Sequence, residues 1–131
     1  MSTQSVGQVM TPFPHSIDIG ADVLAAKVLM DEHDIRHLPV MQERKIVGVL
    51  TDRDIQVAGA LSSDDAPALV REVCHMPAYV VAHDTPLATV LEAMMERHIS
   101  SAVVTDADAL AGVFTLTDAC RLLLDHVNRK H

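Results

Sequence analysis

Apolar and polar residues recur along the chain with two different periods, which together predict a mixed α/β fold. Within ADVLAAKVLMDEHD, apolar residues return every three or four positions, as at Val23, Ala26 and Met30, and this spacing indicates a helix with one buried face. The segments HLPVM and KIVGVL are rich in β-branched residues and are joined by the polar turn QERK. Two such runs around a short polar turn predict a β-hairpin.

The first half of the chain therefore reads as strand, helix, strand, strand, helix, and the second half repeats this order. HSIDI supplies the first strand, and TDRDIQVAGAL opens with Thr and acidic residues, as a helix start does. In the second half AYVVA is a strand, and we expect Asp84 to cap the next helix, with Thr85 and Pro86 in its first turn. SAVVT and ALAGVF form a second hairpin around DADA, and the last helix starts at Thr115.

A shift of the sequence against itself by 64 residues aligns GVLTDRD (48–54) with GVFTLTD (112–118). Ten positions between residues 6 and 54 are identical to their counterparts, without any gap. A gapless repeat of this kind indicates a repeated structural unit. We predict repeats at 6–60 and 70–128, joined by a linker at 61–69 that includes Asp64-Asp65. Neither repeat has enough core to fold alone, so we expect the two to pack sheet to sheet about a pseudo-twofold axis.

Composition narrows the class of protein. The formal net charge is −8 and aromatic residues make up 2% of the chain, which argues against a nucleic-acid-binding surface. No apolar run reaches the roughly 18 residues of a membrane span, and MSTQSVGQVM does not resemble a signal peptide. Cys74 and Cys120 lie in apolar segments and are expected to be reduced, buried thiols. We therefore expect a cytoplasmic protein with neither a nucleic-acid nor a membrane partner.

Each repeat carries Thr-x-x-Asp where a strand turns into a helix, namely Thr51 with Asp54 and Thr115 with Asp118. One interpretation is a capping motif, in which Thr accepts the N–H three residues on and the acid lies at the positive end of the helix. The other is a nucleoside site, because a helix N-terminus attracts anions and a nearby carboxylate accepts hydrogen bonds from ribose hydroxyls. The spacing alone does not choose between them.

Three segments, VMT before the first strand, IRHLPV and GVLTDRDI, together resemble the CBS (cystathionine β-synthase) domain family. The resemblance covers residues from about 6 to 124 and indicates a tandem pair, or Bateman module. Repeat 2 departs from the pattern, with VCHMP in place of VMTPF and SSAVV without the LPV proline.

The resemblance implies a non-enzymatic regulatory module that binds AMP, ADP, ATP, NAD(H) or S-adenosylmethionine in clefts between the two repeats. It implies two groups of binding residues. The first group is Thr51, Asp54, Val80, Ile99, Ser100 and Ser101, and the second is Thr115, Asp118, Thr11, Ser16, Ile35, Arg36 and His37. Since Arg36 and His37 belong to the second group, we expect that site to be the tighter one for phosphorylated ligands. The alternatives are a structural module with no small ligand, and a regulatory subunit of a separate enzyme or transporter.

The sequence also bears on assembly and on metal binding. Leu24, Met30, Leu91 and Met94 on the two central helices exceed what a small pair of sheets can cover, which predicts a homodimer. In the CBS domain family, such dimers form a flat disc that contains two pairs of CBS domains. The eight histidines do not form a zinc-binding pattern, and Cys74-His75 is at most part of a ligand set. No nucleophile stands beside an evident base, so we expect neither a catalytic residue nor a metal site.

Overall fold

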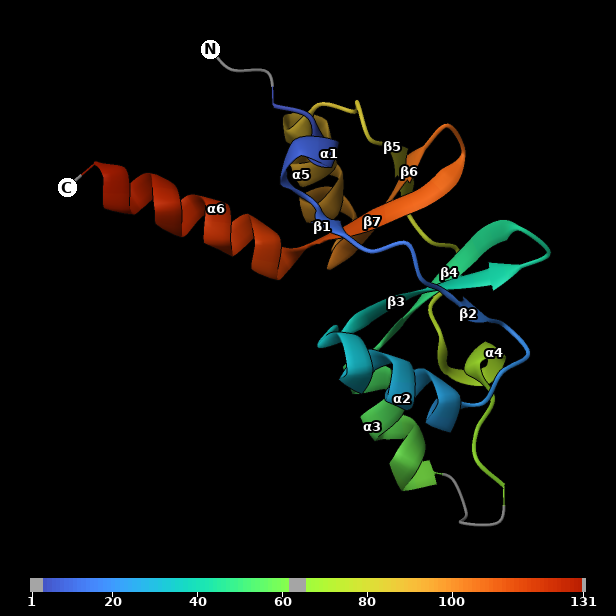
Figure 1. Ribbon diagram of the computed structural model, residues 1–131. Helices are drawn as coiled ribbons and strands as arrows, with labels where there is room; N and C mark the ends of the chain where they lie inside the picture. Colours follow the sequence, from blue (N-terminus) through green and yellow to red (C-terminus); the bar gives the residue numbers. More distant parts are fainter. Residues whose placement is uncertain (1–3, 62–65, 131) are drawn as a thin grey trace. The chain divides into compact units, whose positions relative to one another are not determined.

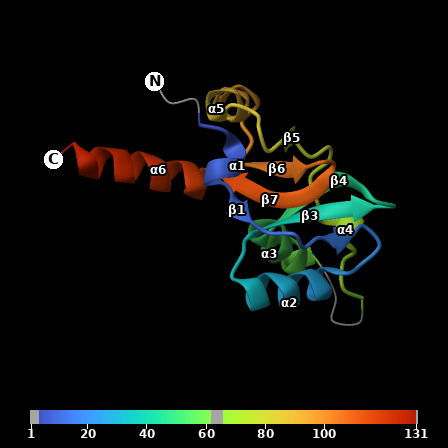
Figure 2. The same ribbon diagram turned by 45° about the horizontal axis from the view of Figure 1, so that its top comes forward.

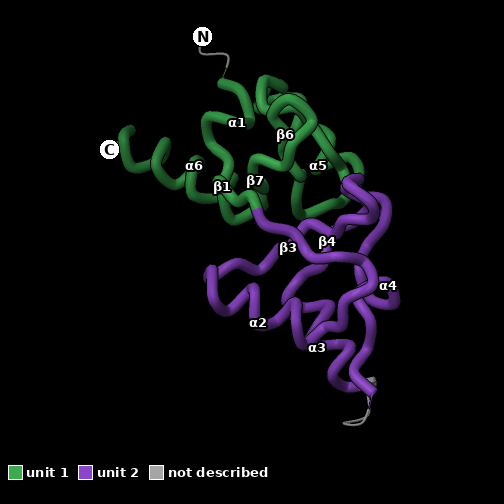
Figure 3. Tube along the Cα trace, turned by 45° about the vertical axis from the view of Figure 1, so that its right-hand side comes forward, with its two compact units in different colours: residues 1–14, 79–131 green, residues 15–78 purple. Residues whose placement is uncertain are grey.

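The computed structural model describes residues 4–61 and 66–130. Residues 62–65, which contain Asp64-Asp65 and the centre of the predicted linker, lie outside the described residues. The chain divides into two compact units (Figure 3). Unit 1 consists of residues 1–14 and 79–131, and unit 2 consists of residues 15–78.

Unit 2 contains a three-stranded sheet in the order β2-β3-β4, drawn in blue to green in Figure 1. Strand β2 is parallel to β3, and β3 is antiparallel to β4. Helices α2 and α3 lie next to each other against this sheet. The elements are β2 (Ile17–Asp18), α2 (Val23–His33), β3 (His37–Gln42), β4 (Lys45–Thr51), α3 (Asp52–Leu61) and α4 (Val70–Val73).

Unit 1 contains a four-stranded sheet in the order β1-β7-β6-β5. Strand β5 is parallel to β6, whereas β7 runs antiparallel to both of its neighbours, β6 and β1. Helix α5 packs against β6, and helix α6 follows β7 directly. The elements are α1 (Val6–Val9), β1 (Thr11–Pro12), β5 (Val80–Ala82), α5 (Leu87–Arg97), β6 (Ser101–Asp106), β7 (Ala109–Thr115) and α6 (Leu116–Arg129).

The two predicted hairpins are confirmed, and they match each other in detail. Their turns place two consecutive non-glycine residues at positive φ, Glu43 and Arg44 in one and Ala107 and Asp108 in the other. Positive φ at both central residues is the geometry of a tight turn whose twist suits the flanking strands. Each hairpin also has a register irregularity at the same place, after Val40 and after Val104.

The short segment before each repeat's first strand is exchanged between the two sequence repeats. Residues 6–12 belong to the first sequence repeat, yet β1 pairs with β7 of the second, with Thr11 opposite Val113. In unit 2 the equivalent His75 pairs with Val49 of the first repeat through two backbone hydrogen bonds, 3.0 and 2.9 Å long. Each compact unit therefore combines the hairpin of one sequence repeat with the leading segment of the other.

This backbone pairing explains why glycine recurs in GVLTDRD and GVFTLTD. A Cβ atom at Gly48 would lie 2.6 Å from the carbonyl oxygen of His75. A Cβ at Gly112 would meet the carbonyl oxygen of Thr11 in the same way. Since both obstacles are backbone atoms, only glycine allows the exchanged segment to approach the strand this closely.

Several predictions about single residues are wrong. Helix α5 begins at Leu87 with Pro86 at the N-cap and has no side-chain cap, so Asp84 does not cap it. Met30 and Met94 are buried in the helix–sheet cores and do not contribute to an exposed surface. Cys74 and Cys120 are free thiols, but Cys74 is only partly buried and Cys120 is exposed.

Apolar side chains nonetheless remain exposed on several helices, among them α2 and α6. In unit 1, α6 leaves the end of β7 and extends away from the sheet (Figure 2). Ala119 and Leu122 pack against the core of this unit, whereas Leu123 is 63% exposed. In unit 2, Leu24 on α2 is 58% exposed. Within the described ranges, no helix is both long enough and apolar enough to span a bilayer.

Candidate functional site

Both Thr-x-x-Asp motifs lie where the last strand of a hairpin turns into a helix. In unit 2 the turn runs from β4 into α3, and in unit 1 it runs from β7 into α6. We call the first the Asp54 corner, made of Thr51, Asp54 and His75. The second is the Asp118 corner, made of Thr11, Thr115, Asp118 and Arg121.

The capping interpretation is confirmed at both corners. In unit 2 the Asp54 N–H donates to Thr51 Oγ1 at 3.1 Å, and the Thr51 N–H donates to Asp54 Oδ2 at 2.9 Å. In unit 1 the same two bonds join Asp118 and Thr115 at 3.3 and 2.9 Å. This reciprocal arrangement satisfies backbone N–H groups at the helix start. Because the cap uses Oδ2 in each case, Oδ1 is left for other partners.

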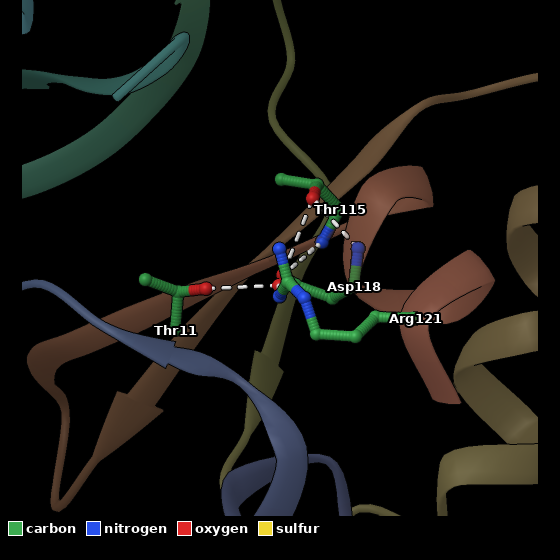
Figure 4. Close-up of polar contacts among 4 residues, drawn as sticks. All are labelled: Thr11, Thr115, Asp118 and Arg121. Carbon is green, nitrogen blue, oxygen red and sulfur yellow. Dashed lines mark hydrogen bonds and ion pairs between the residues drawn. The ribbon is translucent and has the colours of Figure 1, made fainter. Parts of the chain in front are cut away.

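At the Asp118 corner, Oδ1 is held by two side chains (Figure 4). The Thr11 hydroxyl donates to it at 2.9 Å, and Arg121 Nη1 donates at 3.1 Å. The Thr115 hydroxyl also donates to Oδ2 at 3.2 Å. In total Asp118 receives four hydrogen bonds, which is about the capacity of an ionised carboxylate. Its exposed fraction is only 5%. Both oxygens of the buried acid therefore have hydrogen-bond donors, and one donor is the guanidinium of Arg121.

At the Asp54 corner, Oδ1 has a different partner. His75 Nε2 lies 2.8 Å from it, and the imidazole is 73% exposed whereas the Asp54 side chain is 13% exposed. An ionised carboxylate only accepts hydrogen bonds, so Nε2 must carry the hydrogen. Burial, together with the nearby Asp54 charge, raises the pKa of the Cys74 thiol, against an opposing backbone hydrogen bond. A raised pKa keeps Cys74 protonated and makes it a poor nucleophile.

Other predicted site residues in unit 2 lie beside the Asp54 corner. The Arg36 carbonyl accepts the Asp52 N–H at 2.9 Å, and Arg36 Nη1 lies 3.5 Å from Asp52 Oδ2. His37 is paired with Thr51 across the hairpin. Ile35 N–H donates to the Met30 carbonyl at 3.0 Å as the chain leaves α2. Ser16 directly precedes β2 in the same unit.

The equivalent residues of unit 1 have the same arrangement. The Ser100 carbonyl accepts the Leu116 N–H at 3.0 Å, and Ser101 is paired with Thr115. Ile99 N–H donates to the Met94 carbonyl at 3.1 Å. Val80 begins β5 and pairs with Val103. Of the two predicted groups, the structure joins Thr51 with Asp54 in the first, and Thr11, Thr115 and Asp118 in the second, by hydrogen bonds. The rest of each group stays a prediction.

The contact of His75 with the Thr-x-x-Asp motif was not predicted from the sequence, in which His75 was at most a possible metal ligand. The signal was present, since the 64-residue shift aligns His75 with Thr11, which was assigned to a site. Over residues 4–61 and 66–130 there is no cluster of three His, Cys, Asp or Glu side chains suited to a metal ion.

Comparison with known proteins agrees with this architecture. The CBS domain family matches residues 6–60 and 70–125. Hypoxic response protein 1 of Mycobacterium tuberculosis is 33% identical over 104 residues, which cover 78% of this chain and 73% of that protein.

Two similar solved structures contain adenosyl ligands. One is the CBS domain pair of protein MJ0100 with 5′-methylthioadenosine and S-adenosyl-L-methionine. It has a TM-score of 0.78 and 25% identity, and the match covers 92% of this chain and 99% of that one. The other is CBSX2 in complex with AMP, with a TM-score of 0.72 and 27% identity, covering 93% of this chain and 97% of that one. The chain described here belongs to the CBS domain family and contains a tandem pair of CBS domains.

Proposed function

We propose that this chain is a non-enzymatic regulatory module that binds an adenosine-containing ligand at its Asp54 and Asp118 corners. Binding is then signalled by a change in shape or in protein partner. The observation that carries the proposal is that the two oxygens of each aspartate have different partners. Oδ2 belongs to the helix cap, whereas Oδ1 contacts a side chain of another segment, His75 at Asp54 and Thr11 at Asp118. At Asp118, Arg121 of the same helix also donates to Oδ1. Ribose hydroxyls can replace those side-chain donors without breaking the cap.

The surroundings of each carboxylate suit a nucleoside. A helix begins at each corner, and the positive end of a helix dipole favours the anionic part of a nucleotide. A carboxylate beside such a helix start accepts hydrogen bonds from ribose hydroxyls in dinucleotide-binding folds. The adenosyl ligands of MJ0100 and CBSX2 support the same ligand class for this chain.

A thermal-shift series tests the ligand class. AMP, ATP, NADH and S-adenosylmethionine are compared with GTP on protein shown to be ligand-free. A ligand at about one hundred times its dissociation constant stabilises the folded state by about 2.7 kcal/mol. We expect stabilisation by at least one adenine compound and little by GTP. The Arg36 side chain is exposed and positively charged, so we expect it to contact the phosphate of a ligand. Arg36→Ala should therefore reduce the shift with AMP but not with adenosine, which has no phosphate.

No shift with any adenine compound would favour one of two other functions. The first is a structural module with no small ligand, and the second is a subunit that regulates a separate enzyme or transporter through protein contacts. Identifying the proteins that remain bound after purification separates these two.

We also propose that the chain forms a homodimer. Exposed apolar side chains occur on α2 and on α6, including Leu24, Val28, Leu123 and Leu124. Surfaces of this kind commonly mark interfaces, and closed twofold dimers are the most frequent assembly. Light scattering should give twice the chain mass of 14.2 kDa at micromolar concentration. A monomer mass would contradict the dimer.

A further inference from the structure

The Asp54 and Asp118 corners place a different side chain on the same backbone frame. Thr11 and His75 occupy equivalent positions, and each is paired with the strand that precedes the motif. Each side chain also contacts Oδ1 of the aspartate, at 2.9 Å for Thr11 and 2.8 Å for His75. The difference between the two contacts is therefore chemical and does not come from a different backbone path.

A threonine hydroxyl and an imidazole respond differently to an incoming ribose. The hydroxyl is both a donor and an acceptor, and it rotates about its Cβ–Oγ1 bond. Thr11 can therefore keep its place and exchange hydrogen bonds with a ribose hydroxyl that reaches Asp118. The Nε2–H of His75 can only donate, and the ring fills more space beside Oδ1. A ribose hydroxyl must share Asp54 with this ring or displace it.

We infer that His75 is a specificity-determining residue that lowers the preference of the Asp54 corner for ligands with ribose hydroxyls. The inference rests on the proposed function, since it concerns how one corner recognises an adenosine ligand. The contact between His75 and Asp54 is mostly exposed to solvent on the histidine side. Exposed ion pairs and hydrogen bonds of this kind change an equilibrium by about two- to fivefold.

A reciprocal exchange of the two side chains tests the inference on the full chain. His75→Thr gives the Asp54 corner the side chain of the other corner, and Thr11→His does the reverse. His83→Thr is the matched control, because it removes an exposed histidine whose ion pair is with Asp106, at 3.3 Å, and not with Asp54 or Asp118. Each variant is titrated with adenosine and with 2′,3′-dideoxyadenosine, which lacks both ribose hydroxyls.

Amide signals in two-dimensional NMR spectra separate the corners, because Thr51 and Thr115 report on one each. The readout is the ratio of the two affinities, which a loss of general stability would not change. In His75→Thr the preference for adenosine at the Asp54 corner should rise about two- to fivefold. In Thr11→His the preference at the Asp118 corner should fall by a similar factor, and His83→Thr should change neither.

The outcomes separate the inference from the proposed function. If wild-type protein binds adenosine and His75→Thr leaves the ratio at the Asp54 corner unchanged, the inference is wrong and the proposed function stands. If neither nucleoside binds wild-type protein at either corner, the proposed function fails and the inference fails with it. Should Thr11→His lose its folded spectrum, the comparison of His75→Thr with His83→Thr decides alone.

Discussion

The Asp54 and Asp118 corners agree in everything that the backbone determines and differ in what side chains determine. Both have a glycine under the exchanged segment, the same reciprocal cap and the same strand register. Their Oδ1 atoms have different partners, a histidine at one corner and a threonine with an arginine at the other. The backbone frame tolerates few residue types, whereas the side chain facing Oδ1 is free to vary. Differences in binding between the corners should therefore originate at Oδ1.

The largest expected effect comes from breaking the shared frame. Gly48→Ala and Gly112→Ala each place a methyl group against a backbone carbonyl oxygen, and overpacking of this kind costs about 1–3 kcal/mol. Urea denaturation of both variants should show losses of unfolding free energy of similar size.

Gly59→Ala is the matched control for these two variants. It lies in helix α3, and a Cβ there would meet no atom within 4 Å. Alanine has the higher helix propensity, so this change should stabilise the protein by up to about 1 kcal/mol. If Gly48→Ala or Gly112→Ala is as stable as wild type, the close backbone approach described for that corner is wrong.

A smaller effect should distinguish the two aspartates in the absence of ligand. Asp118→Ala removes a cap and the acceptor of four hydrogen bonds whose donors are exposed or partly buried, which together cost about 2 kcal/mol. Asp54→Ala removes a cap whose other partner, His75, is exposed, and should cost about 1 kcal/mol. Denaturation of ligand-free protein measures both values. A greater loss for Asp54→Ala would reverse the comparison.

The elements that were predicted correctly depend on residues that are close to one another in the sequence. The two hairpins follow from β-branched runs around polar turns, and the caps at Thr51 and Thr115 follow from a spacing of three residues. The missed features depend on contacts distant in sequence. The pairing of Thr11 with β7 joins residues about one hundred positions apart, and the contact of His75 with Asp54 follows from the same exchange.

The helix at Leu87 shows a different reason for failure. Asp84, Thr85 and Pro86 each suit a helix start, so the composition of the segment did not determine which residue would be the cap. The Thr85 carbonyl accepts the N–H of Val6 at 2.9 Å, and Leu87 donates to the Gln4 carbonyl at 2.8 Å. Contacts with the N-terminal segment therefore accompany a helix start at Leu87.

Native mass spectrometry with AMP tests the central claim most directly, because it counts bound ligands. If both corners bind, the wild-type chain should take up two AMP molecules, Asp54→Ala and Asp118→Ala one each, and the double variant none. Circular dichroism spectra must first show that each variant is folded. A folded double variant that binds AMP as wild type does, or a wild-type chain that binds none, would contradict the claim that these two carboxylates hold the ligand.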